Sequence, residues 1–399
     1  MVAKRFRGRY SRVMKTITTT EALAEFCNEC ATHPYVTVDT EFLRERTYYS
    51  KLCLVQVAMP GEGTQGAALI DPLAEGMDLA PLYTLFQDES VVKVFHAARQ
   101  DLEIFAVEGG IIPKPFFDTQ VAAMVCGFGE QVGYETLVRK IAREQVDKSS
   151  RFTDWSRRPL SDKQMHYAIG DVTHLRVVYE HLEAELKAKR REGWVQEELA
   201  VLMNPETYIL RPEDAGKRLK TRTNSPRFLA VAYALAQFRE AYAQDRNIPR
   251  PRIFKDDALL ELAANKPKSL EELGRARLLL REARRGPIAE GILKAVKAGL
   301  DLPEKDLPRI AKPAEKPQGN EALGDLLRVL LKAKSGKEGV ASKLIATAAD
   351  LDRIASEAAP DVHALTGWRR EVFGHDALRL KAGEIALSAE PQGVKIIEL

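Results

Sequence analysis

Carboxylates recur in this sequence at spacings that could bring several of them together. Asp39 and Glu41 lie two positions apart in the segment YVTVDTE, residues 35–41. If this segment is a strand, its side chains alternate, so both carboxylates project from one face while Val36 and Val38 face the other. Like charges this close repel and raise a pKa unless a cation neutralises them. Such oxygen ligands suit Mg²⁺ or Mn²⁺, so the pair indicates a metal site, although similar pairs occur by chance on solvated strands.

Two further motifs supply acidic residues later in the chain. Asp101 lies near the start of a helix expected in KVFHAARQDLEIF, where the helix dipole alone already favours a carboxylate. Tyr167 and Asp171 lie four positions apart in YAIGD, on one face of a longer expected helix. Each motif is common when taken alone. Their joint order, with D-x-E on a first strand, Asp at a strand-to-helix junction and Y-x-x-x-D on a later helix, predicts a shared site.

Alternating strand-like and helix-like patterns over the first 200 residues predict the α/β domain that must position these side chains. Strand patterns, which are β-branched, apolar and bounded by turn residues, cover residues 35–41, 51–58, 67–70 and 91–97. Helical patterns cover residues 20–30, 78–87, 98–107, 118–126, 134–143 and 161–189. Ser161 is the expected N-cap of the last helix.

From about residue 190 the pattern is entirely helical, and no strand signal follows. A segment rich in Pro and Lys, LPEKDLPRIAKPAEKPQGN, separates two helical regions and is typical of a linker. We therefore expect a basic leader over residues 1–13, an α/β domain over 14–205, a helical domain over 206–305, a linker over 306–320 and a second helical domain over 321–399.

The net charge of +3 hides an uneven distribution. Residues 1–13 carry five basic and no acidic residues, residues 14–210 carry 20 basic and 30 acidic, and residues 211–311 carry 22 basic and 14 acidic. A basic module therefore follows an acidic one. It could attract nucleic acid through phosphate contacts and counterion release, or it could simply be a solvated helix surface.

Bulk features narrow the class of protein. No apolar run approaches the roughly 20 residues that a membrane-spanning helix needs, so we expect a cytoplasmic protein with no membrane partner. The chain has four cysteines, too few for a disulfide scaffold at this length. Cys27 and Cys30 form a lone C-x-x-C inside an expected helix, which we interpret as two ordinary thiols and not as a zinc site.

Asp39, Glu41, Asp101, Tyr167 and Asp171 together resemble the DEDD exonuclease superfamily in its tyrosine subclass. Their flanking segments, VDTEFLRERTYYSKLCLVQVA, LIDPL, KVFHAARQDLEIF, FFDTQVAA and DKSSRFTDWSRRPLSDKQMHYAIGDVTHL, are similar to the bacterial ribonuclease D family over residues 14–200. The segment from SPRFLAVAYALAQFREAYAQDR to KSLEEL resembles a helicase-and-ribonuclease-D C-terminal (HRDC) domain. Residues beyond 320 would hold a second, divergent domain of this kind, assigned by position.

The resemblance implies a ribonuclease H-like domain, a mixed sheet flanked by helices, followed by all-α helical bundles. It implies a 3′-to-5′ exoribonuclease that trims RNA with a single-stranded 3′ end, tRNA precursors in particular, and releases nucleoside 5′-monophosphates. Asp39, Glu41, Asp101 and Asp171 would coordinate two divalent cations, Mg²⁺ or Mn²⁺, with Asp39 bridging them. Tyr167 would orient the attacking water, because a phenol is a poor base at neutral pH.

Some residues near these motifs carry weaker expectations. A stretch with basic and aromatic side chains could contact phosphates or stack a base: Lys148, Arg151, Trp155 and Arg158. Trp155 is equally plausible as a core anchor. His96 is expected to pack at a strand end, and Asp118 to cap the next helix and not to bind metal.

Several alternatives stay open at this point. The same carboxylate chemistry would serve a general or DNA-directed 3′-to-5′ exonuclease, and a catalytically idle RNA-binding protein is a third possibility. Met14 could be the true start, since the family-like sequence begins there. The oligomeric state is not encoded in any motif, and a monomer is the simplest expectation.

Overall fold

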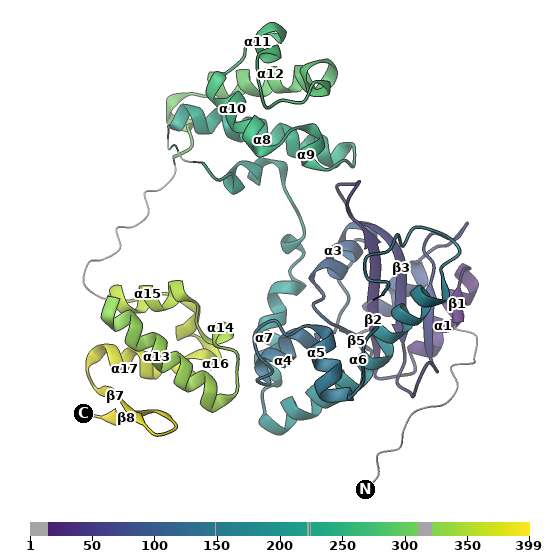
Figure 1. Ribbon diagram of the computed structural model, residues 1–399, viewed down its shortest axis with the longest axis vertical. Coiled ribbons are helices and arrows are strands. Elements are labelled where there is room, and N and C mark those ends of the chain that lie inside the picture. Colours follow the sequence, from purple (N-terminus) through teal and green to yellow (C-terminus); the bar gives the residue numbers. More distant parts are fainter. Residues whose placement is uncertain (1–14, 148, 222, 224, 310–320) are drawn as a thin grey trace.

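The computed structural model describes residues 15–147, 149–221, 223, 225–309 and 321–399. The predicted leader over residues 1–13 and residues 310–320 of the predicted linker lie outside this part of the chain. The chain folds into three successive parts (Figure 1). Each part has its own core of buried apolar side chains. We call these parts the first domain (residues 15–203), the second domain (residues 205–306) and the third domain (residues 321–399).

The first domain is built on a six-stranded mixed sheet with the strand order β1-β4-β3-β2-β5-β6. The central strand β2 pairs antiparallel with β3 and parallel with β5. The strands are β1 (Lys15–Ile17), β2 (Tyr35–Leu43), β3 (Lys51–Ala58), β4 (Ala67–Ile70), β5 (Val92–Phe95) and β6 (Phe116–Asp118). The helices are α1 (Thr20–Cys30), α2 (Ala80–Gln87), α3 (Arg99–Glu108), α4 (Thr119–Val125), α5 (Tyr134–Leu137), α6 (Asp162–Lys189) and α7 (Glu192–Met203). The predicted α/β class is confirmed.

Helices cover both faces of this sheet. Val36 and Val38 of β2 are fully buried in a core that α1, α2 and α3 complete. The long helix α6 lies on the other face, where the hydroxyl of Thr37 donates to the carbonyl of Val172 at 2.8 Å. Ser161 caps α6 as predicted, in a reciprocal pair of hydrogen bonds with Gln164. The alternation of β2 therefore leaves Asp39 and Glu41 on the side of α6.

The sequence patterns locate most of these elements but not all of their limits. Two three-residue strands, β1 and β6, are too short to show an alternating pattern. The strand predicted over residues 91–97 ends at Phe95, because Ala97 has a left-handed backbone with φ 57° that no strand accommodates. The helix predicted over residues 134–143 continues from α5 into a π-helical turn, Val138–Ala142.

The second and third domains are mainly helical. The second contains α8 (Pro226–Asp245), α9 (Arg250–Ile253), α10 (Asp256–Asn265), α11 (Leu270–Gly274) and α12 (Gly286–Asp301), with 3₁₀ turns at Pro205–Thr207, Pro212–Arg218, Glu282–Arg284 and Glu304–Asp306. The third contains α13 (Glu321–Glu338), α14 (Ser342–Ile345), α15 (Ala348–Ser356), α16 (Gly367–Arg369) and α17 (His375–Ala382), with a 3₁₀ turn at His363–Leu365 and a π-helical turn at Arg370–Gly374. Across the described residues, no helix is long and apolar enough to cross a bilayer.

The expectation of a purely helical C-terminal part is wrong at its end. Strands β7 (Ile385–Glu390) and β8 (Gly393–Glu398) form an antiparallel hairpin. Ile385 is buried in the core of the third domain, and Leu387 and Ile396 are partly buried against it. The hairpin therefore gains its stability from one apolar face, which a helical period does not describe.

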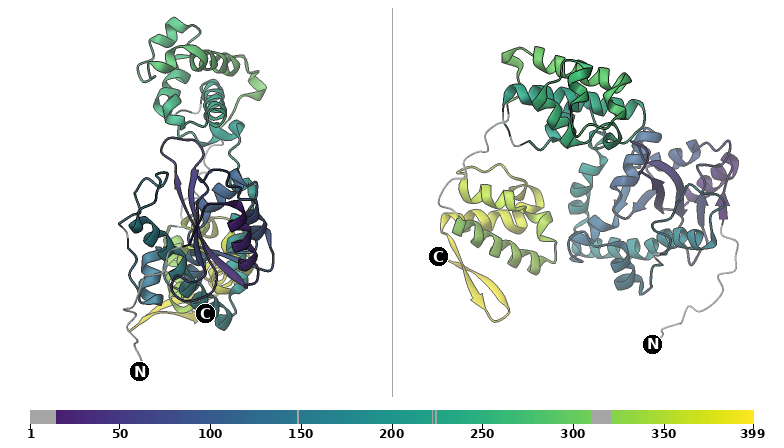
Figure 2. Two further views of the ribbon diagram at one scale, coloured as in Figure 1. Left: turned by 90° about the vertical axis from the view of Figure 1, so that its right-hand side faces the viewer. Right: turned by 45° about the horizontal axis from the view of Figure 1, so that its top comes forward.

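The third domain packs against the first (Figure 2). The rings of Trp194 in α7 and Trp368 in α16 stack with centroids 4.3 Å apart. Arg191 donates to the carbonyl of Glu338 at 2.8 Å and forms an ion pair with its carboxylate at 3.0 Å. Arg369, which is 2% exposed, pairs with Glu197 of α7. These buried contacts join the two domains across α7.

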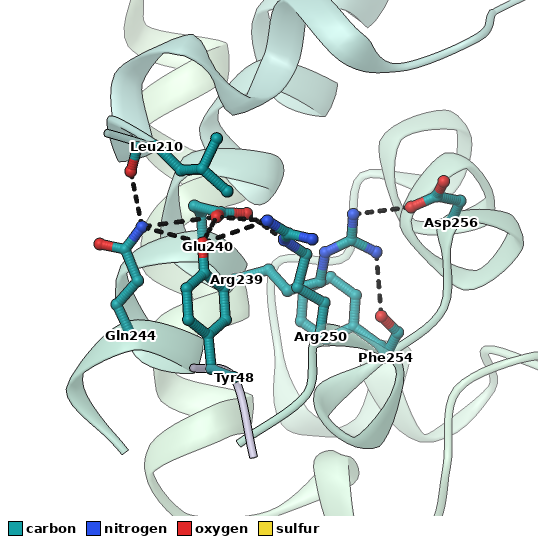
Figure 3. A network of polar contacts seen from close by, with 8 residues as sticks. All are labelled: Tyr48, Leu210, Arg239, Glu240, Gln244, Arg250, Phe254 and Asp256. Atoms are coloured by element: carbon teal, nitrogen blue, oxygen red, sulfur yellow. Dashed lines mark hydrogen bonds and ion pairs between the residues drawn. The ribbon is translucent and has the colours of Figure 1, made fainter. Parts of the chain in front are cut away.

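The second domain forms polar contacts with the loop between β2 and β3 (Figure 3). The hydroxyl of Tyr48 donates to Glu240 of α8, and Arg250 pairs with the same carboxylate. The backbone amides of Tyr48 and Tyr49 both donate to the side chain of Asn247 at 3.0 Å. This loop begins directly after β2, so the contact lies only a few residues from Glu41.

Candidate active site

One open cavity of about 630 Å³ in the first domain collects the five residues of the predicted site. Its lining includes Asp39 and Glu41 from β2, Asp101 from α3, and Tyr167 and Asp171 from α6. Three elements that are distant in sequence therefore meet near the C-terminal end of the central strand β2. The cavity is large enough for a small organic ligand.

Three of the carboxylates are near neighbours. Asp39, Glu41 and Asp171 each offer an oxygen, and these oxygens lie within 4.8 Å of one another. The register of β2 against β3 shifts between Glu41 and Phe42, which marks a bulge directly beside the acidic pair. A bulge of this kind changes where side chains point and is common next to active sites.

Asp101 approaches the same cavity from the other side of β2. The hydroxyl of Thr40, which alternates with Asp39 and Glu41, donates to the Asp101 carboxylate. Asp101 is 7% exposed and lies in the first turn of α3. Asp101 therefore lies at the strand-to-helix junction, as predicted. Its contact with Thr40 could not be predicted from the sequence spacing.

The pKa values of these carboxyl groups are raised. Burial is the largest cause for Asp39 and Asp101, and the charge of a neighbouring aspartate adds to it. Burial and the three aspartates raise the pKa of Glu41 to about 10, and burial raises that of Asp171 to about 7. A cluster that resists ionisation in this way is stabilised in its charged form by a bound cation.

Tyr167 keeps its proton in this environment. Burial raises its pKa, and the surrounding carboxylates, Asp171 first among them, raise it further. Its hydroxyl donates a hydrogen bond to Asp171. Tyr167 is thus a hydrogen-bond donor fixed beside the carboxylates and not a base.

Tyr134 lines the cavity although no sequence pattern singles it out. Its hydroxyl donates to the backbone carbonyl of Asp171 at 2.7 Å. His96 also faces the cavity, with Nδ1 3.0 Å from the hydroxyl of Thr119, and burial lowers its pKa. Both contacts join segments far apart in the chain, so local spacing carries no signal for them.

Asp118 has the capping role expected of it. Its carboxylate accepts hydrogen bonds from the backbone amides of Ala97, Ala98 and Gln120. These contacts join the end of β6 to the turn before α3. Asp118 therefore supports the turn from which Asp101 follows, and its oxygens are directed at backbone amides.

Three of the four predicted substrate contacts can be placed. Arg151 lines the cavity, and its charge lowers the pKa of Glu41 and Asp171. Trp155 is 2% exposed within a core cluster, so a base cannot stack on it and the core alternative is correct. Arg158 is not available to a phosphate either, because it pairs with both oxygens of Asp71 at 2.6 and 2.7 Å. Lys148 lies outside the described residues.

The comparisons with known proteins agree with this geometry. Residues 14–187 match a family model described as a 3′-5′ exonuclease, and residues 228–296 match the HRDC domain model. The first domain thus belongs to the class of 3′-to-5′ exonucleases, whose fold is metal-dependent, and the acidic group required for a metal is present.

Full-length relatives define the family more narrowly. A ribonuclease D from Jannaschia sp. is 62% identical over 384 residues, covering 96% of this chain and 99% of the relative. A ribonuclease D from Granulibacter bethesdensis is 51% identical over 382 residues, covering 96% of each. The crystal structure of Escherichia coli RNase D superposes with a TM-score of 0.79 at 28% identity, covering 93% of this chain and 99% of that one.

The chain belongs to the ribonuclease D family. It is accordingly a hydrolase, a 3′-to-5′ exoribonuclease whose products carry 5′-phosphates, and RNA is its substrate class. The alternative of a catalytically idle RNA-binding protein is wrong on this basis.

Proposed function

We propose that this protein trims the 3′ ends of structured RNAs, tRNA precursors in particular, by two-metal-ion hydrolysis. The observation that carries the proposal is the group of four carboxyl groups that line one cavity, where burial raises the pKa of each. Hard oxygen donors in this number fit Mg²⁺ or Mn²⁺. Asp39, Glu41, Asp101 and Asp171 would hold the two cations.

The chain's own side chains would orient the reacting groups. When bound, two divalent cations supply electrostatic stabilisation of the attacking and leaving oxygens of an in-line displacement. Tyr167 would hold the attacking water by accepting a hydrogen bond from it on the hydroxyl oxygen, whose own proton is donated to Asp171. Arg151 binds a phosphate oxygen at the cavity wall. Tyr134 fixes the backbone of Asp171 and with it the carboxylate.

Structured RNA is the substrate we favour for two reasons. The Escherichia coli relative is described as an exoribonuclease involved in structured RNA processing. The second domain follows an acidic first domain and carries an excess of basic residues, with which it can hold the folded part of such an RNA. The cytoplasm, where tRNA precursors occur, is the location we propose, with a monomer as the working assembly.

The test is directional degradation in solution. A 5′-labelled tRNA with a short 3′ extension, incubated with Mg²⁺, should give a ladder that shortens stepwise from the 3′ end, and EDTA should abolish it. Asp101→Asn should abolish cleavage while far-UV circular dichroism stays unchanged, because it removes a ligand charge and little volume. Near-wild-type turnover of this variant would refute the site.

A matched DNA strand in the same assay tests sugar choice. Degradation of DNA at the rate of RNA would show a general exonuclease in place of an RNA-directed one. An RNA ladder that stops within the extension on tRNA, but not on an unstructured RNA of equal length, would support the trimming role.

A further inference from the structure

A large aromatic side chain stands exposed at the mouth of the cavity. Phe152 is 92% exposed, the highest value among the exposed large hydrophobic residues of the described chain, and it lines the same cavity as Asp39 and Glu41. Leaving a phenylalanine side chain in water forgoes the favourable free energy of burying it. An apolar ring displayed at the entrance of a ligand cavity is therefore a candidate contact for the ligand itself.

Arg151 links this ring to the carboxylates. Its guanidinium lies over the Phe152 ring, 5.4 Å from the centroid. The same charge is close enough to Glu41 and Asp171 to lower the pKa of both. A cation and an aromatic face are thus presented side by side, immediately outside the acidic group. This pairing matches one nucleotide unit, which combines a phosphate with a flat base.

The turn that carries Phe152 is anchored on both sides. Ser150, which is 2% exposed, accepts a hydrogen bond from the hydroxyl of Thr153 through its carbonyl at 2.8 Å. The side chain of Gln164 in the capping box of α6 donates to the Thr153 hydroxyl at 3.2 Å. Buried Trp155 then fixes the chain just beyond. These contacts fix the position of Phe152 relative to Tyr167 and Asp171, which lie on α6 together with Gln164.

We propose that Phe152 is a stacking platform for one nucleobase of the single-stranded 3′ end bound in the cavity. The inference rests on the proposed function and adds a base contact to it. Every base has a π-face, so the platform binds without sequence preference. It requires an unpaired base, and it thus selects single-stranded ends over paired ones by contact with the base face.

The decisive experiment removes the proposed contact in two ways: from the protein, by substituting Phe152, and from the RNA, by removing one base. Wild type and Phe152→Ala are compared on RNAs that carry one abasic nucleotide at the last, second-last or third-last position. Phe152→Ala should raise KM for intact RNA by about 5- to 160-fold, the range of one base–aromatic stack, with kcat nearly unchanged. At one of the three positions, the abasic substitution should raise KM in wild type and have no further effect in the variant.

Two further variants serve as controls. Phe152→Trp should keep or lower KM because it retains a stacking face, whereas Val201→Ala, at an exposed apolar position on α7 outside the cavity lining, should change nothing. Additive effects of Phe152→Ala and the abasic substitution at all three positions would overturn the platform. If wild type fails to shorten RNA with Mg²⁺, the proposed function fails; if wild type cleaves and Phe152→Ala matches it in KM, only the platform fails.

Discussion

The raised pKa values of the carboxyl groups have a measurable consequence for metal binding. Asp171 titrates near 7 in the folded chain against an ordinary value of 3.8, so its protonated form is favoured by the fold. This contribution to stability is present at low pH and is lost as the pH rises through about 7. A divalent cation replaces the proton as the neutralising charge.

We therefore predict that Mn²⁺ stabilises the protein more at pH 8 than at pH 6. The Tm of the metal-free protein should be lower at pH 8 than at pH 6. The gain in Tm on adding Mn²⁺ should be larger at pH 8. Asp171→Asn, which carries no titrating proton at this position, is the matched control and should reduce both trends without removing them, because the pKa of Glu41 is also raised, to about 10. An equal Tm gain at the two pH values in wild type would contradict the prediction.

Tyr167 permits a test of water orientation separate from metal binding. Tyr167→Phe removes only the hydroxyl, so kcat should fall by about 10²-fold, the scale of losing one positioned hydrogen-bonding group, while the Mn²⁺ concentration for half-maximal activity stays within about twofold. Asp171→Asn should raise that concentration and lower kcat together. If Tyr167→Phe weakened the metal dependence as much as the aspartate variant does, its assigned role would be wrong.

For single residues of the site, the sequence predicts which side chains share a face of one helix or strand. It does not predict which residues from distant segments come into contact. Alternation in β2 and helical spacing in α6 predict which side chains share a face. Tyr134 reaches Asp171 across 37 positions, and no local period encodes that contact. Trp155 shows the opposite limit, because a tryptophan among basic residues has the same pattern whether it is buried or exposed.

Among the elements, the loop between β2 and β3 links the acidic strand to the second domain. Tyr48 is its main side-chain contact: the hydroxyl meets Glu240, which is 3% exposed, and the ring lies 5.0 Å from the Arg250 guanidinium. Arg44, directly after β2, pairs with Glu103 of α3 at 3.0 Å. Contacts of this loop thus connect α3, whose first turn carries Asp101, to α8 of the second domain.

Tyr48→Phe should loosen this loop. Losing a hydrogen bond to a charged, buried partner costs about 1.5–3 kcal/mol, so amide hydrogen exchange over residues 44–50 should accelerate. Tyr49→Phe is the matched control, since within the described residues the Tyr49 hydroxyl makes no hydrogen bond and its amide contact to Asn247 survives. Unchanged exchange in Tyr48→Phe would show that the amide contacts alone hold the loop.

The helices and strands themselves could be predicted where a regular apolar spacing continues over many residues. Residues 20–30 and 161–189 show helical spacing over several turns, and α1 and α6 follow it closely. The hairpin of β7 and β8 does carry β-branched residues around Gly393, such as Val394 and Ile396, but its six-residue strands follow a long helical stretch that dominates the pattern. The domain limits at 205, 305 and 320 stay predictions.

For the whole molecule, the basic character of the second domain predicts salt-dependent RNA binding. Arg277, Arg281 and Arg285 are exposed around the turns between α11 and α12. Their joint substitution by Gln should weaken binding and reduce the slope of log K against log salt by about 2, near 0.7 for each lost phosphate contact. Fluorescence anisotropy with a labelled tRNA over a salt series measures this slope.

The same three positions substituted by Lys provide the control. They keep the charge and should keep the slope, although any bidentate phosphate contact is weakened. A slope that is unchanged in the Gln variant would place the RNA elsewhere on the molecule. A slope reduced equally in the Lys variant would point to a loss of folding in this segment.

The stacked tryptophans that join the first and third domains also have a consequence for the second domain. Its sequence lies between two parts that are docked onto each other, so it is tethered at both ends to a single body. If the Tyr48 contact opens, rebinding is intramolecular and occurs at a high effective concentration, on the millimolar scale of short tethers. RNA that occupies the cavity and the second domain together would then be retained by avidity between successive cuts, even where each contact alone is weak.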